Sequence, residues 1–432
     1  MIDLLRELFP LRLAPASDGL DRAVEILCRE LPFEIHEYAS GREHNGWVVP
    51  PKWEVHRAEI WRDGALVHDG LANPLGVISL SEPFSGRVPL EELRRHLLSH
   101  PTLRHALVYH CDLLYKPWRA DWGFTMAHED VERLEPGDYD VVLETSHTPG
   151  TMKVCTFHLP GSSEETIVLN AHDCHPGQAN DDIAGVVVGV EVMRRLRERE
   201  NRFSYRLVIA PEHLGTVFYL ADLPADDRRR LKYGAFLEML GTDGRIGLQE
   251  TFGGDTLIDR AAWDVLSRTP GAERFAFRKL VGNDETVWEA PGIEVPCISI
   301  ARYPYAEYHS SDDTDAIISE DRLVEAADAV TRILEIIESD CTMHRRFDGL
   351  VALGNPRYDL YIATFDPSLG VSVSAQQRDW NYLMDCLPRY FDGETTVLDV
   401  AERHGLPFHD VLAYVRRFEE KRLITLEAAY HA

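Results

Sequence analysis

Four nearly continuous apolar segments in the middle of the chain constrain the fold more than any other feature. They span residues 166–172, 205–213, 234–240 and 296–303. A helical pattern at 183–200 follows the first segment, and a long amphipathic pattern at 320–340, opened by Ser319, follows the last. Apolar runs without polar alternation are typical of strands buried on both faces. Buried strands alternating with helices predict an α/β fold, with a mostly parallel sheet and helices on both faces.

The residue pattern outside these four segments indicates further domains. Its 432 residues exceed one ordinary core, so we expect two or three domains. Short strand-like runs punctuated by Gly and Pro at 37–125 predict a small β-rich domain. Residues 346–374 are irregular and rich in Gly, Pro and Asp, which indicates a linker. Residues 375–432 have the order helix, helix, turn, helix, strand, which predicts a winged helix.

Charge and composition exclude several functions. The net charge of −27 argues against nucleic acid as a partner, because phosphates would be repelled. Residues 376–432 carry seven Lys and Arg against ten acids, so we expect the winged helix to mediate packing or homo-oligomer formation. Seven scattered cysteines without a CxxC pair, and no apolar run of membrane-spanning length, predict a cytoplasmic protein without a membrane partner.

Polar side chains close or follow each of the four apolar segments. His172 ends the first, Glu212 and His213 end the second, Glu238 lies within the end of the third, and His309 follows the fourth. In an open α/β sheet, sites form at the carboxyl ends of the strands. Neutral imidazole and carboxylate are ligands that zinc prefers. A single histidine at a strand end is more often structural, but the recurrence at four strands predicts a metal site.

The motifs in this region resemble a known enzyme family. "VLNAHDC", "ANDDIAG", "VIAPEHLG" and "YHSSDDT" are similar to elements of the zinc aminopeptidases of peptidase family M28. The chain more closely resembles bacterial proteins with an aminopeptidase-like domain that are linked to polysaccharide biosynthesis. That resemblance rests on "CHP", "AND", "NDETVWEAPGIEVPCISIARYPYAEYHSSDD" and the C-terminal pattern, and it covers nearly the whole chain. It implies that the β-rich domain is an insertion, so that the aminopeptidase-like domain comprises residues 1–36 and 126–345.

The resemblance also implies roles for single residues. It makes Glu212 the general base, and it makes Asp181 a metal-bridging ligand because Asp181 stands four residues before a glycine. Asp182 also stands just before a helix, and a role in capping that helix suits it well. The implied metal ligands are His172, Asp181, His213, Glu238 and His309.

Two positions depart from the family pattern. Cys174 stands where the aminopeptidases have an aspartate that orients the first histidine, and His213 stands where they have a glutamate ligand. The departures leave open whether the site holds one zinc ion or two. A single zinc on Asp181, His213 and His309 would also make an open three-ligand site.

Further residues are candidates for contact with substrate. His175 follows Cys174 and could reach the metal, or hydrogen-bond backbone in the turn at Pro176. The other candidates are Asp284, Glu285, Arg302 and Tyr305, with a solvated loop as the alternative for the two acids.

The functional hypothesis is a zinc-dependent hydrolase of aminopeptidase type. It would cleave a peptide or small amide by metal-activated water, with Glu212 as general base. One alternative is a one-zinc amidohydrolase or a glutaminyl-cyclase-like acyltransferase. Another is a metal-free binding or scaffold protein in a biosynthetic pathway. The sequence does not identify the substrate.

Overall fold

The computed structural model describes residues 1–362 and 375–429. Within them the chain forms two compact units. One unit comprises Met1–Gly254 and Gly271–Asp328, and the other comprises Asp255–Pro270 and the residues from Ala329 onward.

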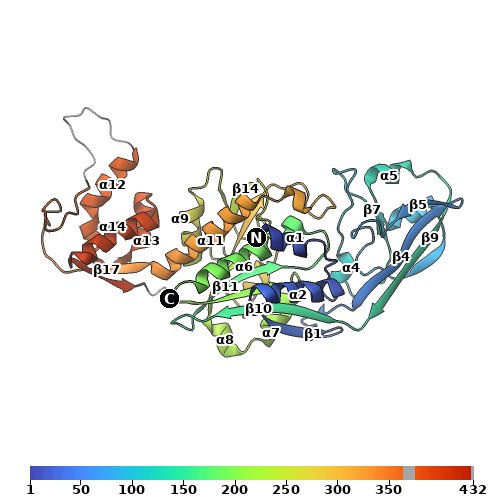
Figure 1. The fold of residues 1–432 in the computed structure, drawn as a ribbon, viewed down its shortest axis with the longest axis horizontal. Helices are drawn as coiled ribbons and strands as arrows, with labels where there is room; N and C mark the ends of the chain where they lie inside the picture. Colours follow the sequence, from blue (N-terminus) through green and yellow to red (C-terminus); the bar gives the residue numbers. More distant parts are fainter. Residues whose placement is uncertain (363–374, 430–432) are drawn as a thin grey trace. The chain divides into compact units, whose positions relative to one another are not determined.

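The first unit is built on an eight-stranded sheet (Figure 1). In spatial order its strands are β1 (Glu34–Ala39), β10 (Thr151–Leu159), β12 (Ser204–Ala210), β11 (Thr166–His172), β13 (Leu231–Leu237), β16 (Cys297–Tyr303), β14 (Arg245–Gln249) and β15 (Glu273–Phe275). The central strands β12, β11, β13 and β16 are parallel, and every residue of β11 is buried. Antiparallel pairings attach β10 and β1 on one side and β14 on the other. The predicted α/β fold with a parallel centre is confirmed, and antiparallel strands flank that centre.

Helices cover both faces of this sheet. On one face α6 (Ala184–Arg197) packs so closely that a Cβ on Gly189 would lie 2.9 Å from Leu207 Cδ1. On the other face Val208 clusters with Phe218 of α7 (Leu214–Asp222), as expected because neighbouring strand residues point to opposite faces. The other helices near this sheet are α1 (Ile2–Leu8), α2 (Asp18–Glu30), α8 (Ala225–Arg230) and α10 (Glu285–Trp288). Among the described residues, the helices are all too short or too polar to cross a membrane.

A separate four-stranded antiparallel sheet lies in the same unit. Its order is β5 (Ala65–Asp69), β4 (Lys52–Arg62), β9 (Asp138–Thr148) and β6 (Phe84–Pro89). Small elements accompany it: β2 (Glu43–His44), β3 (Trp47–Val48), β7 (Leu97–Leu98), β8 (Phe124–Thr125), α3 (Leu90–Leu93), α4 (Asp112–Tyr115) and α5 (His128–Arg133). Residues 139–146 and 151–159 alternate in sequence like the two strands of a hairpin, but this prediction is wrong, because β9 pairs with β4 and β6 whereas β10 joins the main sheet. This sheet therefore continues beyond residue 125, and its status as an inserted domain stays a prediction.

The second unit combines helices with a three-stranded sheet. The strands are β18 (Asp392–Thr396), β17 (Cys341–Arg345) and β19 (Ile424–Ala428). The helices are α9 (Leu257–Leu266), α12 (Ala375–Cys386), α13 (Val397–His404) and α14 (Phe408–Glu420), and α11 (Glu320–Ser339) runs from the first unit into the second. Thr396 caps α13, and Gly405 ends it in the left-handed conformation. The name winged helix stays a prediction, and residues 363–374 of the predicted linker lie outside the described residues.

Candidate metal centre

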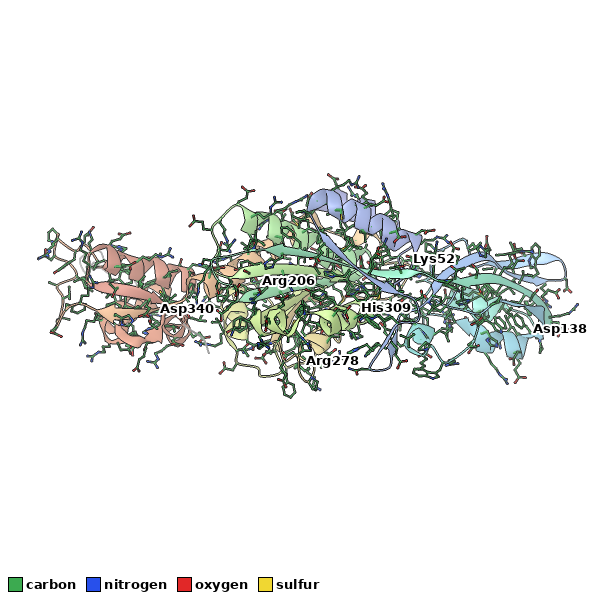
Figure 2. All side chains as sticks on the ribbon, turned by 90° about the horizontal axis from the view of Figure 1, so that it is seen from below. Lys52, Asp138, Arg206, Arg278, His309 and Asp340 are labelled. Atoms are coloured by element: carbon green, nitrogen blue, oxygen red, sulfur yellow. The ribbon has the colours of Figure 1, made fainter. Side chains whose placement is uncertain are left out.

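The carboxyl edge of the main sheet gathers the residues that follow its strands. His172 ends β11, Glu212 and His213 lie between β12 and α7, and Glu238 follows β13. His309 lies in the loop after β16 (labelled in Figure 2). These positions share one edge because β11, β12, β13 and β16 are parallel.

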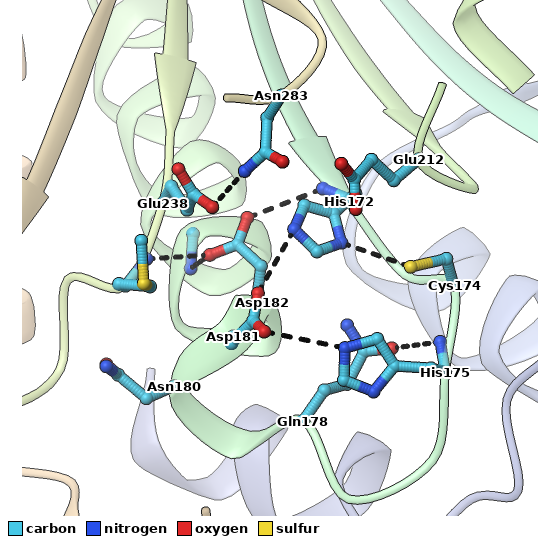
Figure 3. Close-up of polar contacts among 12 residues, drawn as sticks. His172, Cys174, His175, Gln178, Asn180, Asp181, Asp182, Glu212, Glu238 and Asn283 are labelled. Carbon is cyan, nitrogen blue, oxygen red and sulfur yellow. Dashed lines mark hydrogen bonds and ion pairs between the residues drawn. The ribbon is translucent and has the colours of Figure 1, made fainter. Parts of the chain in front are cut away.

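Asp181 is the point at which three histidines meet. His172 Nε2 lies 3.4 Å from Asp181 Oδ1, and the Nε2 atoms of His175 and His309 lie 3.5 and 3.2 Å from Oδ2. Figure 3 shows His172 and His175 reaching Asp181 from different sides. Burial alone would raise the pKa of Asp181, but the three imidazoles close to its carboxylate outweigh burial and lower the pKa well below 3.8. Asp181 is therefore an ionised, deeply buried carboxylate.

Backbone hydrogen bonds fix the loop that carries Asp181. Asp313 accepts from the backbone N–H groups of Asn180 and Asp181 at 2.8 and 3.1 Å. Asp182 Oδ1 accepts from the N–H of Gly185 at 3.1 Å and of Met239 at 3.0 Å, so Asp182 caps the start of α6. A Cβ on residue 185 would lie 2.1 Å from Leu237 O, so only glycine allows α6 to begin this close to the sheet.

The centre contains two groups of ligand atoms that share Asp181. One group is His172, Asp181 and Glu238, and the other is His175, Asp181 and His309. Within each group the ligand atoms lie within 4.8 Å of one another. Asn283 donates a hydrogen bond to Glu238 Oε1 (Figure 3). Burial raises the pKa of Glu238 well above its usual value, and the carboxylates of Asp181 and Asp182 raise it further.

Several of these buried atoms have no hydrogen-bond partner among the described residues. They are His172 Nε2, His175 Nε2, Asp181 Oδ2 and Glu238 Oε2. A buried polar atom without a partner costs about 1–3 kcal/mol, and several rarely occur together. One cation in each of the two groups would give all four atoms a partner, and imidazole with carboxylate suits zinc. The donor set therefore fits a metal site.

His175 belongs to this cluster, and a position near the metal is one of the possibilities that the sequence left open for it. Its backbone N–H donates to Gln178 Oε1 at 2.6 Å, and its ring stacks on Tyr109 at 4.1 Å between centroids. Its Nδ1 lies 3.1 Å from Pro176 O, which leaves Nε2 directed at Asp181. The turn predicted at Pro176 and the approach to the metal site are thus compatible.

His213, in contrast, lies outside both groups of ligand atoms among the described residues. Its Nδ1 is 3.2 Å from Asp284 Oδ1, and its Nε2 is 3.4 Å from Glu212 Oε1. Asp284 is fully buried and also accepts a hydrogen bond from Thr216 Oγ1 at 2.5 Å. This geometry does not place His213 in the ligand set expected from the sequence, because both ring nitrogens face carboxylates.

Glu212 and Cys174 lie beside His172. One ligand atom from each of the three residues falls within 4.8 Å of the others, and Cys174 Sγ is 3.4 Å from His172 Nδ1. Burial raises the pKa of the Cys174 thiol to about 11, so this group is neutral and orients the ring of His172. Burial also raises the pKa of Glu212, with a smaller contribution from neighbouring carboxylates. A raised pKa suits a group that must take up a proton.

The remaining candidates for substrate contact are mostly engaged within the protein. The Arg302 guanidinium is 3% exposed and donates to Leu240 O, Gly244 O and Glu325. Glu285 is fully buried, like Asp284, and accepts from the N–H of Asn283. Tyr305 donates to Asp313 and lines the cavity described next.

A cavity of about 1050 Å³ opens beside the cluster. Glu212, Glu238 and His309 border it on the side of the metal-ligand groups. Much of its wall is aromatic: Trp47, Tyr109, Tyr115, Trp118, Tyr305 and Tyr308. Apart from Tyr305, the functional analysis of the sequence missed this wall, because aromatic residues such as Tyr109, Tyr115 and Trp118 carry no catalytic signature.

A protein-family model described as "Domain of unknown function (DUF4910)" matches residues 2–340. A Clostridium acetobutylicum protein, provisionally named a polysaccharide biosynthesis protein with aminopeptidase-like domain, is 26% identical over 412 residues. The match covers 95% of this chain and 92% of that protein.

Solved structures of aminopeptidase-like proteins also resemble this chain. A crystal structure from Clostridium acetobutylicum, provisionally described as a peptidase, matches with a TM-score of 0.82 at 25% identity and covers 99% of this chain and 96% of that one. The zinc aminopeptidase BSAP from Bacillus subtilis matches with a TM-score of 0.58 at 15% identity, covering 77% and 92%. The resemblance noted from the motifs is thus confirmed, and the fold is that of the zinc aminopeptidases.

Proposed function

The chain belongs to the DUF4910 family, and from this premise we propose that it is a zinc-dependent hydrolase of aminopeptidase type that cleaves a peptide or small amide. One observation carries the proposal. Four buried ligand atoms, from His172, His175, Asp181 and Glu238, have no hydrogen-bond partner in the described part of the chain and converge at the strand edge, where enzymes with this fold place their sites.

Two ions fit the donor set. His172, Asp181 and Glu238 would hold one, and His175, Asp181 and His309 would hold the other. Asp181 would serve both. Bound zinc would polarise the scissile carbonyl and lower the pKa of a coordinated water to about 7.

Glu212 is the group that moves the proton. Its carboxylate borders the cavity beside His172, where it can take a proton from water and return it to the leaving amine. His213 Nε2 lies 3.4 Å from Glu212 Oε1 and positions that carboxylate. Asp284 fixes the ring of His213 through Nδ1. Trp47 and Tyr115 pack against that ring and restrict its contact with water.

The alternatives are weaker on specific grounds. A one-zinc enzyme would leave one of the two groups of ligand atoms without a cation, which restores the cost of buried unpaired atoms. A metal-free scaffold would leave the ligand atoms of both groups without a cation. The predictions of a cytoplasmic location and of self-association through residues 375–432 remain predictions.

The His175→Ala and His213→Ala variants test the ligand assignment directly. We expect zinc-loaded His175→Ala to lose about one of two zinc equivalents, because one site then has two protein ligands. His213→Ala should retain both equivalents, because its ring faces Asp284 and Glu212. Elemental analysis after gel filtration measures both. Loss of zinc from His213→Ala with full retention in His175→Ala would reverse the assignment.

A further inference from the structure

The cavity beside the metal cluster has an uneven distribution of charge. The carboxylates of Glu212 and Glu238 lie at the cluster, whereas the loop at residues 276–284 contributes Arg278 and Lys279. The third lining cation, Arg302, is already engaged with Glu325 and backbone carbonyls. The chain has a net charge of −27. Two exposed cations at the wall of this cavity therefore contrast with the negative charge of the protein as a whole.

Arg278 is held in position by the protein. Its guanidinium lies against Gly282 so closely that a Cβ there would be 2.5 Å from Nη1. Fully buried Glu285 is 3.5 Å from Nη1 and is its one ion-pair partner among the described residues. Lys279 has no ion pair with any residue in the described part of the chain. These contacts restrain the Arg278 guanidinium and leave side-chain donors for a ligand.

Two observations single out the loop that carries Arg278. Three residues separate Lys279 from Asn283, which donates a hydrogen bond to Glu238. Arg278 itself has φ +63°, a left-handed conformation that is uncommon for residues other than glycine. Strained backbone of this kind is concentrated at ligand-binding sites. The loop therefore links the metal cluster to a constrained cation.

We propose that the substrates are short peptides or amides whose leaving half ends in a free carboxylate, and that Arg278 binds this carboxylate with Lys279 as an auxiliary charge. The inference rests on the proposed function, since it takes the scissile bond to lie at the metal cluster. Guanidinium and carboxylate form strong, often bidentate pairs. A cavity of about 1050 Å³ matches a small ligand rather than a folded protein.

Binding to a protein that cannot turn over tests this site. The zinc-loaded Glu212→Gln variant is titrated by calorimetry with leucyl-glycyl-phenylalanine and with its C-terminal amide. We expect the free acid to bind about 10-fold more tightly, a factor typical of one charge-assisted hydrogen bond. Adding Arg278→Gln should bring the two dissociation constants together by weakening the acid alone. Adding Gly282→Ala should have a similar but smaller effect, because it moves the guanidinium without removing its charge.

The controls distinguish carboxylate binding by Arg278 from a general effect of positive charge and from binding at the metal. Arg133→Gln on α5 removes the same charge outside the cavity and should leave the preference intact. Equal binding of acid and amide, or no binding of either, contradicts the proposal. A preference that survives Arg278→Gln would also contradict it, since the carboxylate would then bind elsewhere. If the preference holds but wild-type enzyme cleaves neither peptide, the carboxylate site stands and the hydrolase proposal falls.

Discussion

Asp181→Asn is expected to lose both metal ions, because Asp181 is the residue that the two groups of ligand atoms share. The amide has nearly the shape of the carboxylate but lacks the charge that balances the cations. The loss of affinity should exceed the roughly 10–100-fold that removal of an outer-shell partner costs. Elemental analysis of the purified variant, with competition by a chelator of known affinity, measures the change.

Asp173→Asn is the matched control for this variant. Asp173 is a buried carboxyl next to His172, yet it belongs to neither group of ligand atoms that contains Asp181. Burial raises its pKa to about 8, so the amide replaces a group that is mostly neutral at pH 7. Asp173→Asn should keep both ions. Full metal content in Asp181→Asn would show that Asp181 is not a ligand.

Glu212→Gln is expected to keep the metal and lose turnover by about 10²–10⁴-fold, the usual contribution of a general base. Glutamine retains the size of the side chain but cannot accept the proton. The loss should fall on kcat rather than on the affinity for substrate, since Glu212 acts on the water. Steady-state kinetics on a panel of aminoacyl amides and peptides, with metal content measured on the same samples, separates the two effects. Wild-type turnover in this variant on any substrate of the panel would refute the mechanism.

The strand ends of the main sheet could be predicted because their signal is local. A continuous apolar run such as residues 166–172 fixes a buried strand, and the first polar residue after it must emerge at the sheet edge. His172, Glu212 and Glu238 were located in this way. Asp182 as a helix cap follows from equally local chemistry, and Gly185 N–H donates to it as expected.

The direction of a side chain at a strand end could not be predicted in the same way. His213 turns toward Asp284, which lies 71 residues later in the sequence, and no local pattern encodes that contact. His175 turns toward Asp181 because it stacks on Tyr109, which comes from the segment before β9. The separation of β9 from β10 has a similar cause, since the partners of β9 are the distant strands β4 and β6.

The zinc content of the purified wild-type protein tests the central claim most directly. The protein is expressed with zinc in the medium, freed of loosely bound metal by gel filtration, and analysed for zinc per chain. The two groups of ligand atoms around Asp181 predict about two equivalents, both removable by a strong chelator and restored on adding zinc. A protein that is folded, binds no zinc and takes up no other divalent metal would contradict the account.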